Sequence, residues 1–593
     1  MKTRISQVYR DHYLQEAKTA ALSQGRDVIH GDLLVKAEAI DRLRSTRRNF
    51  WRDPWSVATA KGLENYNLQV HGRVIRVEAY AQAQETFAYG LDQSSIHLVG
   101  GDNKEAQIKA WTRITGTLDP AWGLKNFWIN EGHSFGITAA GGAGWQLAEW
   151  IVDGEPTIDM LGVEPRRYGN YATKSYLKAK NEEAYSHVFI VHYPDEERPA
   201  ARPLRTAPCY ERMKALGAVF GQKFGWERPN FFATDGMEQK DDWSFRRSKW
   251  FDAIKKECEN VKKNVGLLDM TAFAKCRIKG PKAEEFLDYL VANKLPKKIG
   301  RINLCHALNT KGGVHSEFTI MKEAENSYYL VSAGANLRLD HDWIQKWMPT
   351  DGSVIFEDLT NSTGVLVVAG PKARQLMQKV STDDFSNENF KWLTAKNVNV
   401  GYAPVNAMRV NFVGELGWEL HHPIEYQNHI FDKLMEAGKD LGIKPFGIRA
   451  MNSLRIEKSY KLVGTELSIE YSPYESGLDR FVHPNKGNFI GLEALNKWRE
   501  KGFDNKLVTL EVHNTTDSDV LGNNPIYKDD KVVGRATGGE YGFRIDKSIA
   551  LAMVKPDLAN VGEKLKVDIL GKMYEATILE ESPYDSENKL LRA

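Results

Sequence analysis

The spacing of apolar residues changes along the second half of the chain, and this change limits the folds that are open to it. Between residues 231 and 500, segments with the 3.6-residue period of a helix alternate with short period-2 segments, which predicts an α+β unit. Between residues 505 and 580 only the period-2 pattern recurs, with polar turns between the segments. That pattern favours a small antiparallel β-barrel.

The predicted elements can be given by residue number. Helices are expected over 245–261, 283–291, 339–347, 371–380, 426–441 and 449–458. Barrel strands are expected over 507–512, 524–527, 531–534, 549–554, 565–569 and 574–579. Upstream, we predict a strand over 126–130, a Gly-rich turn, and then a helix over 144–152. A strand over 188–192 and a helix over 210–220 would follow.

Length and composition indicate a multidomain globular protein. One hydrophobic core stops growing at about 250–300 residues, so a chain of 593 residues should hold several domains. The net charge is +2 and no long run of like charges occurs, which gives no electrostatic reason to expect a nucleic-acid or membrane partner. The cysteines form no C-x-x-C pair, so we expect reduced core thiols and no metal site; they are Cys209, Cys258, Cys276 and Cys305.

The N-terminal residues bear on the compartment in which the protein works. They lack the apolar run of a secretory signal, and no stretch of about 18 apolar residues occurs anywhere in the chain. We therefore expect a cytoplasmic protein. A mitochondrial presequence is the alternative, but Asp11 and Glu16 are unusual in such presequences, which are poor in acidic residues.

Two segments place a glutamate in a period-2 stretch behind a glycine-containing turn. They are NTKGGVHSEFTI (309–320), with Glu317, and RVNFVGELGWEL (409–420), with Glu419. One strand carboxylate can accept paired N–H groups from the amino-pyrimidine edge of a pterin, and another can handle a proton at reacting nitrogens. Taken alone, the segments are also compatible with two surface hairpins that carry solvated glutamates.

From about residue 126 onward the chain resembles the dimethylglycine and sarcosine dehydrogenase family. The C-terminal half of that family is a folate domain similar to the glycine-cleavage T-protein, an aminomethyltransferase. Besides the two glutamate segments, the resemblance is carried by FWINEGHSFGITAAGGAG (127–144), LAEWIVDGEP (147–156), RPLRTAP (202–208), GAVFGQKFGWERP (217–229), GIRAMNSLRIE (447–457) and ESPYDSENKLLR (581–592).

The resemblance implies an α+β multidomain protein. A T-protein-like folate-binding fold with a C-terminal antiparallel β-barrel would be preceded by a remnant of an FAD-dependent oxidoreductase domain. The expected divisions are an unassigned region (1–120), the flavin-domain remnant (121–160), a central linking domain (161–230), the folate-binding domain (231–500) and the barrel (501–593). Within 1–120, helical periodicity covers 14–21 and 33–43, and 68–80 alternates like a strand pair.

The resemblance also implies roles for the two glutamates. Aligned through the Gly-Gly turn, Glu317 falls where T-proteins place a catalytic aspartate beside the folate nitrogens, and it is one methylene longer. There it would steer the attack of tetrahydrofolate on an iminium and take up the released proton. Glu419 matches the pterin-binding glutamate of the family. Trp418 is expected on the opposite face of the strand, in the core.

Three further residues are candidates for folate binding. Arg449 and Arg455 lie on the family helix that supplies an arginine to the glutamate tail of folate, although the T-protein arginine itself aligns with Met451. An ion pair with Glu457 on the helix surface is the alternative for either arginine. Tyr584 matches an aromatic position near the folate. The pair His421-His422 has no spaced third ligand and is expected at the surface.

The chain departs from the family in its flavin region. A dinucleotide-binding fold needs a G-x-G-x-x-G turn behind an early strand, so that the pyrophosphate can approach bare backbone, and no such motif precedes Asn126. The residues ahead of Asn126 are also too few for the βαβ units of a flavin domain. We therefore do not expect the chain to bind FAD by itself.

The resulting hypothesis is a tetrahydrofolate-dependent one-carbon transferase. It would accept the carbon from an N-methylated amine, or from the iminium or formaldehyde that such an amine yields on oxidation, and would give 5,10-methylenetetrahydrofolate. One alternative is an FAD-dependent dimethylglycine or sarcosine dehydrogenase whose flavin fold comes from a partner flavoprotein subunit. The other is a non-catalytic folate-binding subunit.

Overall fold

The computed structural model describes residues 115–120, 128–133, 136–164, 167–169, 171–187, 190 and 192–593. The elements predicted at 14–21, 33–43 and 68–80, and most of the strand predicted at 188–192, lie outside the described residues. The chain divides into two compact units, and each is described by itself. The first is Met1–Pro156 with Met160–Ile190, and the second is Thr157–Asp159 with Val191–Ala593.

The described residues of the first unit include an antiparallel strand pair and two helices. Strand β1 (Thr115–Pro120) pairs with β2 (Trp128–His133), and α6 (Gly136–Asp153) and α7 (Lys174–Ser186) follow. The predicted Gly-rich turn is wrong, because Gly141, Gly142 and Gly144 lie inside α6. Each helical glycine costs only about 1 kcal/mol, and the neighbouring alanines are the strongest helix formers, so the helix continues through the glycines.

The second unit begins with α8 (Tyr210–Ala215) and the antiparallel pair β3 (Ala218–Lys223) and β4 (Trp226–Phe232). The helix predicted over 210–220 is therefore too long. Gly217 has a φ of +95°, a left-handed conformation that ends the helix and lets the chain turn into β3.

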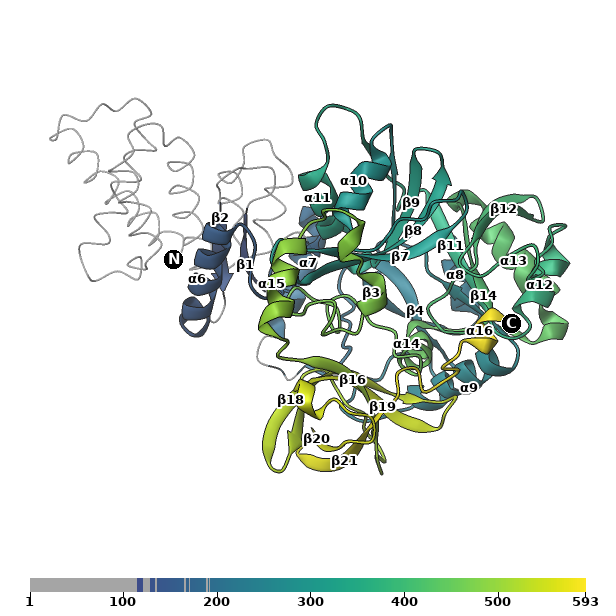
Figure 1. The fold of residues 1–593 in the computed structure, drawn as a ribbon. Helices are drawn as coiled ribbons and strands as arrows, with labels where there is room; N and C mark the ends of the chain where they lie inside the picture. Colours follow the sequence, from purple (N-terminus) through teal and green to yellow (C-terminus); the bar gives the residue numbers. More distant parts are fainter. Residues whose placement is uncertain are drawn as a thin grey trace, which may run out of the picture. The chain divides into compact units, whose positions relative to one another are not determined.

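A five-stranded antiparallel sheet forms one layer of the second unit (Figure 1). Its order is β10 (Ile355–Asp358), β6 (Ala274–Lys279), β9 (Ser327–Ser332), β8 (Val314–Ala324) and β7 (Ile302–Leu308). Helices α10 (Ala283–Leu290) and α11 (Leu337–Trp347) cover one face and bury a core that includes Phe318, Ile320 and Leu330.

A six-stranded sheet forms a second layer. Its order is β12 (Ala395–Val400), β13 (Ala403–Met408), β14 (Gly417–Pro423), β11 (Thr363–Ala369), β5 (Val265–Asp269) and β15 (Ile443–Pro445), and only the β5–β15 pair is parallel. Residues of α12 (Ala373–Val380) and α13 (Gln427–Ala437) pack on one face. Residues of α9 (Trp250–Lys263) and α14 (Ile448–Ile456) pack on the other.

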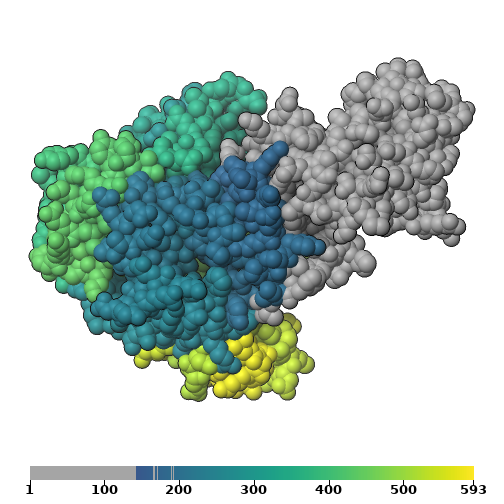
Figure 2. Space-filling model, turned by 180° about the vertical axis from the view of Figure 1, so that it is seen from behind, coloured from purple at the N-terminus to yellow at the C-terminus, as the bar shows by residue number. Residues whose placement is uncertain are grey.

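The last part of the second unit is a closed barrel. Its strands follow the order β16 (Lys506–Val512), β19 (Lys547–Val554), β18 (Lys531–Gly542), β17 (Pro525–Lys528), β20 (Lys564–Ile569) and β21 (Lys572–Leu579). Between the α+β part and the barrel lies α15 (Leu492–Lys501), and α16 (Lys589–Arg592) ends the unit. Figure 2 shows barrel residues, in yellow, beside earlier residues of the same unit. The predicted α+β unit and barrel are both confirmed.

The four cysteines are free and buried, as predicted. All six helices predicted between 231 and 500 are present, although the one predicted over 426–441 ends at Ala437 and a short 3₁₀ turn follows it. In the described part of the chain, no helix has both the length and the apolar character that crossing a membrane requires.

Candidate functional site

Glu317 lies on β8 and faces the layer between the two sheets. Its neighbour Phe318 points to the opposite side, into the core beneath α10 and α11. Met321 shares the face of Glu317, because side chains alternate along a strand, and it packs with Tyr329 of β9 and Met408 of β13. The Glu317 side chain is 21% exposed. The carboxylate therefore lies on the face of the sheet that carries Met321, and it keeps some access to solvent.

A buried histidine holds one oxygen of Glu317. His306 lies on β7 directly across from Glu317, is fully buried, and places Nε2 at 2.9 Å from Oε2 of the glutamate. No motif in the sequence marks His306. A β-bulge between Ala307 and Leu308 sets this pairing. In a regular hairpin His306 would oppose Ser316, so counting residues outward from the turn would not predict the contact between His306 and Glu317.

Glu419 faces the same layer from the six-stranded sheet. It lies on β14 across from Met408 of β13, and Met408 packs between the sheets. Trp418 points to the opposite side, where it is fully buried in the core under α12 and α13, as predicted. The Glu419 side chain is only 10% exposed.

A second histidine, which was expected at the surface, contacts Glu419. His421 lies two residues along β14, and its Nε2 is 3.3 Å from Oε2 of Glu419. Its Nδ1 is 3.0 Å from the hydroxyl of Tyr329, which belongs to the other sheet. Burial raises the pKa of Tyr329 well above its ordinary value, so the phenol stays protonated. Tyr329 therefore donates to Nδ1, and the Nε2–H of His421 donates to the carboxylate.

The prediction that His421 and His422 lie at the surface is wrong. Both are buried, because they follow Glu419 along the central part of the sheet. Burial lowers the pKa of His422 to about 4, so its imidazole is neutral. The residues that the structure describes contain no group of three or more His, Cys, Asp or Glu side chains that could hold a metal ion.

The two glutamates have the same arrangement. In each, an imidazole contacts one carboxylate oxygen, and no described residue hydrogen-bonds to the other oxygen. Both side chains face the layer between the sheets. Two carboxylates with one open oxygen each can accept N–H donors or protons from a molecule that lies against this layer.

Arg449 forms an ion pair with an acidic residue of the protein. Its two terminal nitrogens are 3.0 and 2.8 Å from the two carboxylate oxygens of Asp241, a bidentate pair. The guanidinium also lies over the rings of Phe231 and Trp250. To bind the tail of folate, Arg449 would have to leave Asp241.

Arg455 is buried on the same helix. Its Nε donates to Asn452 at 2.8 Å, and one terminal nitrogen donates to the carbonyl of Tyr460 at 2.9 Å and lies 3.3 Å from Glu466. The alternative of an ion pair with Glu457 is wrong for both arginines, since Glu457 pairs with Arg544 of the barrel.

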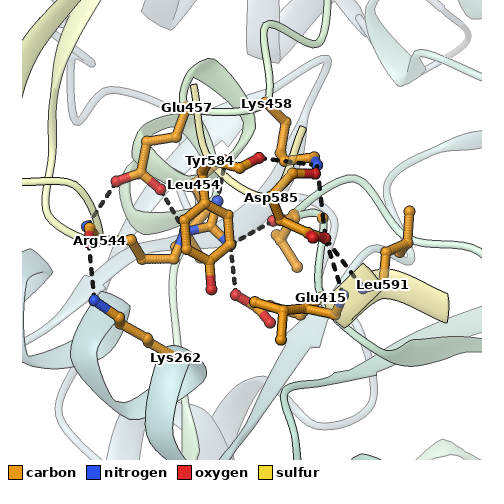
Figure 3. Close-up of polar contacts among 12 residues, drawn as sticks. Lys262, Glu415, Leu454, Glu457, Lys458, Arg544, Tyr584, Asp585 and Leu591 are labelled. Atoms are coloured by element: carbon orange, nitrogen blue, oxygen red, sulfur yellow. Dashed lines mark hydrogen bonds and ion pairs between the residues drawn. The ribbon is translucent and has the colours of Figure 1, made fainter. Parts of the chain in front are cut away.

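Tyr584 packs over a buried ion cluster (Figure 3). The ring lies 3.9 Å from the guanidinium carbon of Arg544, which bonds to the carboxylates of Glu457 and, at 2.7 Å, Glu415. The backbone N–H of Tyr584 donates to the carbonyl of Glu457 at 3.0 Å. Burial, together with the charge of Glu415, raises the pKa of Tyr584. The ring is thus held against the junction of sheet, α14 and barrel, and a contact with folate stays a prediction.

One hollow of about 430 Å³ lies elsewhere on the second unit. Its lining includes Pro203, Tyr210 and Glu425, and none of the five predicted site residues. We therefore do not assign it to the site that contains the two glutamates.

Three family models match successive parts of the chain. Residues 153–207 match the FAD dependent oxidoreductase central domain, and residues 209–486 match the GCVT N-terminal domain. Residues 505–585 match the glycine cleavage T-protein C-terminal barrel domain. The last two models cover the two sheets and the barrel described above.

Known proteins are similar over the same region. The chain is 39% identical to a mitochondrial dimethylglycine dehydrogenase of Mus musculus over 467 residues, which are 78% of this chain and 53% of that protein. It is 32% identical to an aminomethyltransferase of Caldanaerobacter subterraneus subsp. tengcongensis over 396 residues, 65% of this chain and 97% of that protein. The chain thus spans about half the length of the dehydrogenase and nearly all of the aminomethyltransferase.

A solved structure has the same fold. The crystal structure of the glycine cleavage system aminomethyltransferase T from Bartonella henselae superimposes with a TM-score of 0.56 at 21% identity, and covers 65% of this chain and 99% of that chain. At this identity the likeness concerns the fold alone. The family models and the sequence relatives show that the chain belongs to the dimethylglycine and sarcosine dehydrogenase family and carries the aminomethyltransferase (glycine cleavage T-protein) domain of that family.

Proposed function

We propose that the chain is an enzyme that transfers a one-carbon unit to tetrahydrofolate, with Glu317 as the catalytic carboxylate and Glu419 as the pterin-binding one. The observation that carries this proposal is that two carboxylates from different sheets face one layer, each with one open oxygen. The carbon would come from an N-methylated amine or from its iminium or formaldehyde product, and the product would be 5,10-methylenetetrahydrofolate.

The surroundings of Glu419 fit a pterin. Its carboxylate is nearly buried, and His421 contacts only one of its oxygens, so paired N–H donors can approach the other. A buried carboxylate that lacks such donors is costly to keep, which favours a ligand that provides them. Arg449, Arg455 and Tyr584 remain proposed contacts for the rest of the folate, and the two arginines would have to exchange their present partners.

Glu317 is suited to accept a proton. When bound, tetrahydrofolate supplies the two N–H groups whose nitrogens take up the one-carbon unit. Capture of an iminium at two N–H groups releases the parent amine and one further proton, whereas condensation with formaldehyde moves the two N–H protons onto the departing water. In both reactions a group that accepts a proton and passes it on is useful beside the reacting atoms. The open oxygen of Glu317 can take that proton, while the neighbouring strands shield the site from much of the solvent.

The pterin assignment can be tested by binding. Glu419→Ala should weaken binding of 5-formyltetrahydrofolate, a stable folate, by about 1–3 kcal/mol, because a paired donor edge would lose its acceptor. Isothermal titration measures this directly. Glu436→Ala removes the same charge from a side chain that is 71% exposed on the helix α13 and should leave affinity unchanged. Equal affinity of Glu419→Ala and the wild type would refute the assignment.

The catalytic assignment can be tested by turnover. Glu317→Gln should lower the protein-dependent rate at which tetrahydrofolate condenses with formaldehyde, while folate affinity changes by less than the rate does. Glu325→Gln, at the exposed turn after β8, is the matched control. A wild-type rate in Glu317→Gln would remove the glutamate from the mechanism. Folate binding with no protein-dependent rate in any variant would favour the non-catalytic folate-binding subunit.

A flavin dehydrogenase is the second candidate. The match of residues 153–207 to the central domain of FAD-dependent oxidoreductases favours it, and the relative from Mus musculus is named a dimethylglycine dehydrogenase. In this case a partner flavoprotein subunit would oxidise the amine, and the present chain would receive the product. Restoration of amine oxidation by a co-purified flavoprotein would support this candidate.

A cytoplasmic location is part of the proposal. The dimethylglycine dehydrogenases that match the chain are named mitochondrial, so a mitochondrial location is the alternative. Fractionation of cells that express the full-length gene product with a C-terminal tag distinguishes the two compartments.

A further inference from the structure

We infer that His306 is a positioning residue that fixes the carboxylate of Glu317 in its working orientation. The inference rests on the proposed one-carbon transfer at Glu317. In the ladder between β7 and β8, His306 and Glu317 lie directly opposite each other. His306 is fully buried, and its Nε2 is 2.9 Å from Oε2 of Glu317.

The partners of the imidazole define the direction of the hydrogen bond. An ionised carboxylate can only accept, so Nε2 must carry the hydrogen and donate. The other nitrogen, Nδ1, is buried and has no hydrogen-bond partner among the described residues. The ring of Phe481, 5.4 Å away between centroids, packs beside the imidazole. All of the hydrogen bonding of this histidine is therefore directed at Glu317.

This contact leaves the two oxygens of Glu317 in different states. Oε2 is held by the imidazole, whereas no described residue hydrogen-bonds to Oε1. A glutamate side chain has one more rotatable bond than an aspartate, so a free glutamate would sample more orientations of its carboxylate. The hydrogen bond from a rigid, fully buried ring removes that freedom and directs Oε1 toward the layer between the sheets.

The test compares two substitutions at the same buried position. His306→Leu removes the donor and keeps an apolar group of similar bulk. His306→Gln keeps an N–H donor at the same number of bonds from the backbone as Nε2. We expect His306→Leu to lower kcat of the formaldehyde condensation on the order of 10-fold or more, the usual effect of losing a hydrogen bond to a charged group, with KM for tetrahydrofolate little changed. His306→Gln should recover most of kcat. Equal losses in both variants would overturn the inference.

A double-mutant comparison separates positioning from packing. If His306 acts through Glu317, His306→Leu should cause little further loss in a Glu317→Gln background. Phe481→Leu, which changes packing against the same imidazole without touching Glu317, is the matched control and should keep kcat within about two-fold. A loss from His306→Leu that is as large in the Glu317→Gln background as in the wild type would contradict the inference.

A spectroscopic measurement tests the contact without any turnover. In protein with ¹⁵N-labelled histidine, the ring of His306, assigned by its loss in His306→Gln, should show the Nε2–H tautomer. Its Nε2 and proton shifts should move in Glu317→Gln and stay unchanged in Glu325→Gln. Unmoved shifts, or an Nδ1–H tautomer, would overturn the inference. If the wild type shows no protein-dependent condensation, the proposed function fails, while these shifts still decide whether His306 holds Glu317.

Discussion

At the scale of single residues, the candidate site depends on two buried histidines whose partners are glutamates. His306 contacts Glu317 within one sheet, and His421 contacts Glu419 while accepting a hydrogen bond from Tyr329 of the other sheet. Each histidine occupies one oxygen of its glutamate and leaves the other open. The site is therefore held by cross-strand and same-strand neighbours, which are rigid, and not by loops.

Asp340 gives a prediction for the pH dependence of stability. It is buried on α11, and burial raises its pKa to about 7, although the hydroxyl of Ser332 donates to it at 2.7 Å. Because its pKa is higher in the folded than in the unfolded protein, the folded protein holds a proton that the unfolded chain has released between about pH 4 and 7. The contribution of this group to stability is therefore complete below about pH 4 and is lost as the pH rises through 7.

Asp340→Asn should remove this dependence. The variant is expected to gain stability relative to the wild type at pH 8, by up to a few kcal/mol, and to gain little at pH 4.5. Urea unfolding at the two pH values measures the difference. Asp235→Asn, at an exposed position, is the control. An equal effect of Asp340→Asn at both pH values would show that the carboxyl group does not titrate in this range.

At the scale of elements, the turn between β7 and β8 positions Glu317. Gly313 lies against the backbone carbonyl of Ile469, and a Cβ at this position would overlap that carbonyl oxygen. The hairpin can therefore dock only with a glycine here, and its docking sets where β8 carries Glu317.

Gly313→Ala should displace the hairpin. We expect a loss of about 1–3 kcal/mol in the free energy of unfolding, together with a lower rate of one-carbon transfer, because backbone must move to admit the methyl group. Gly538→Ala is the control, since a Cβ there meets no atom within 4 Å. Denaturant unfolding and the condensation assay measure both effects. A Gly313→Ala protein with wild-type stability would contradict the tight docking.

At the scale of the whole molecule, the prediction concerns whether the chain binds FAD. The full chain is expected to be colourless after purification, and again after incubation with FAD and desalting, because no G-x-G-x-x-G turn precedes Asn126. The visible absorption spectrum is the measurement, with a known flavoprotein desalted in parallel. Retained flavin bands would favour the dehydrogenase and show that another part of the chain binds the dinucleotide.

Sequence alone determined the kinds of element, the division into an α+β part and a barrel, and the strands that carry Glu317 and Glu419, because the period of apolar residues is a local property. The continuation of α6 through its glycines and the early end of α8 were missed, since both depend on small local balances of backbone energy.

Pairings between distant side chains needed the tertiary structure. A single bulge puts His306 opposite Glu317. Because the barrel docks on the α+β part, Glu457 forms its ion pair with Arg544, and Arg449 pairs with Asp241 instead. Such pairings follow from register and packing between segments that are far apart in sequence, and no local pattern encodes them.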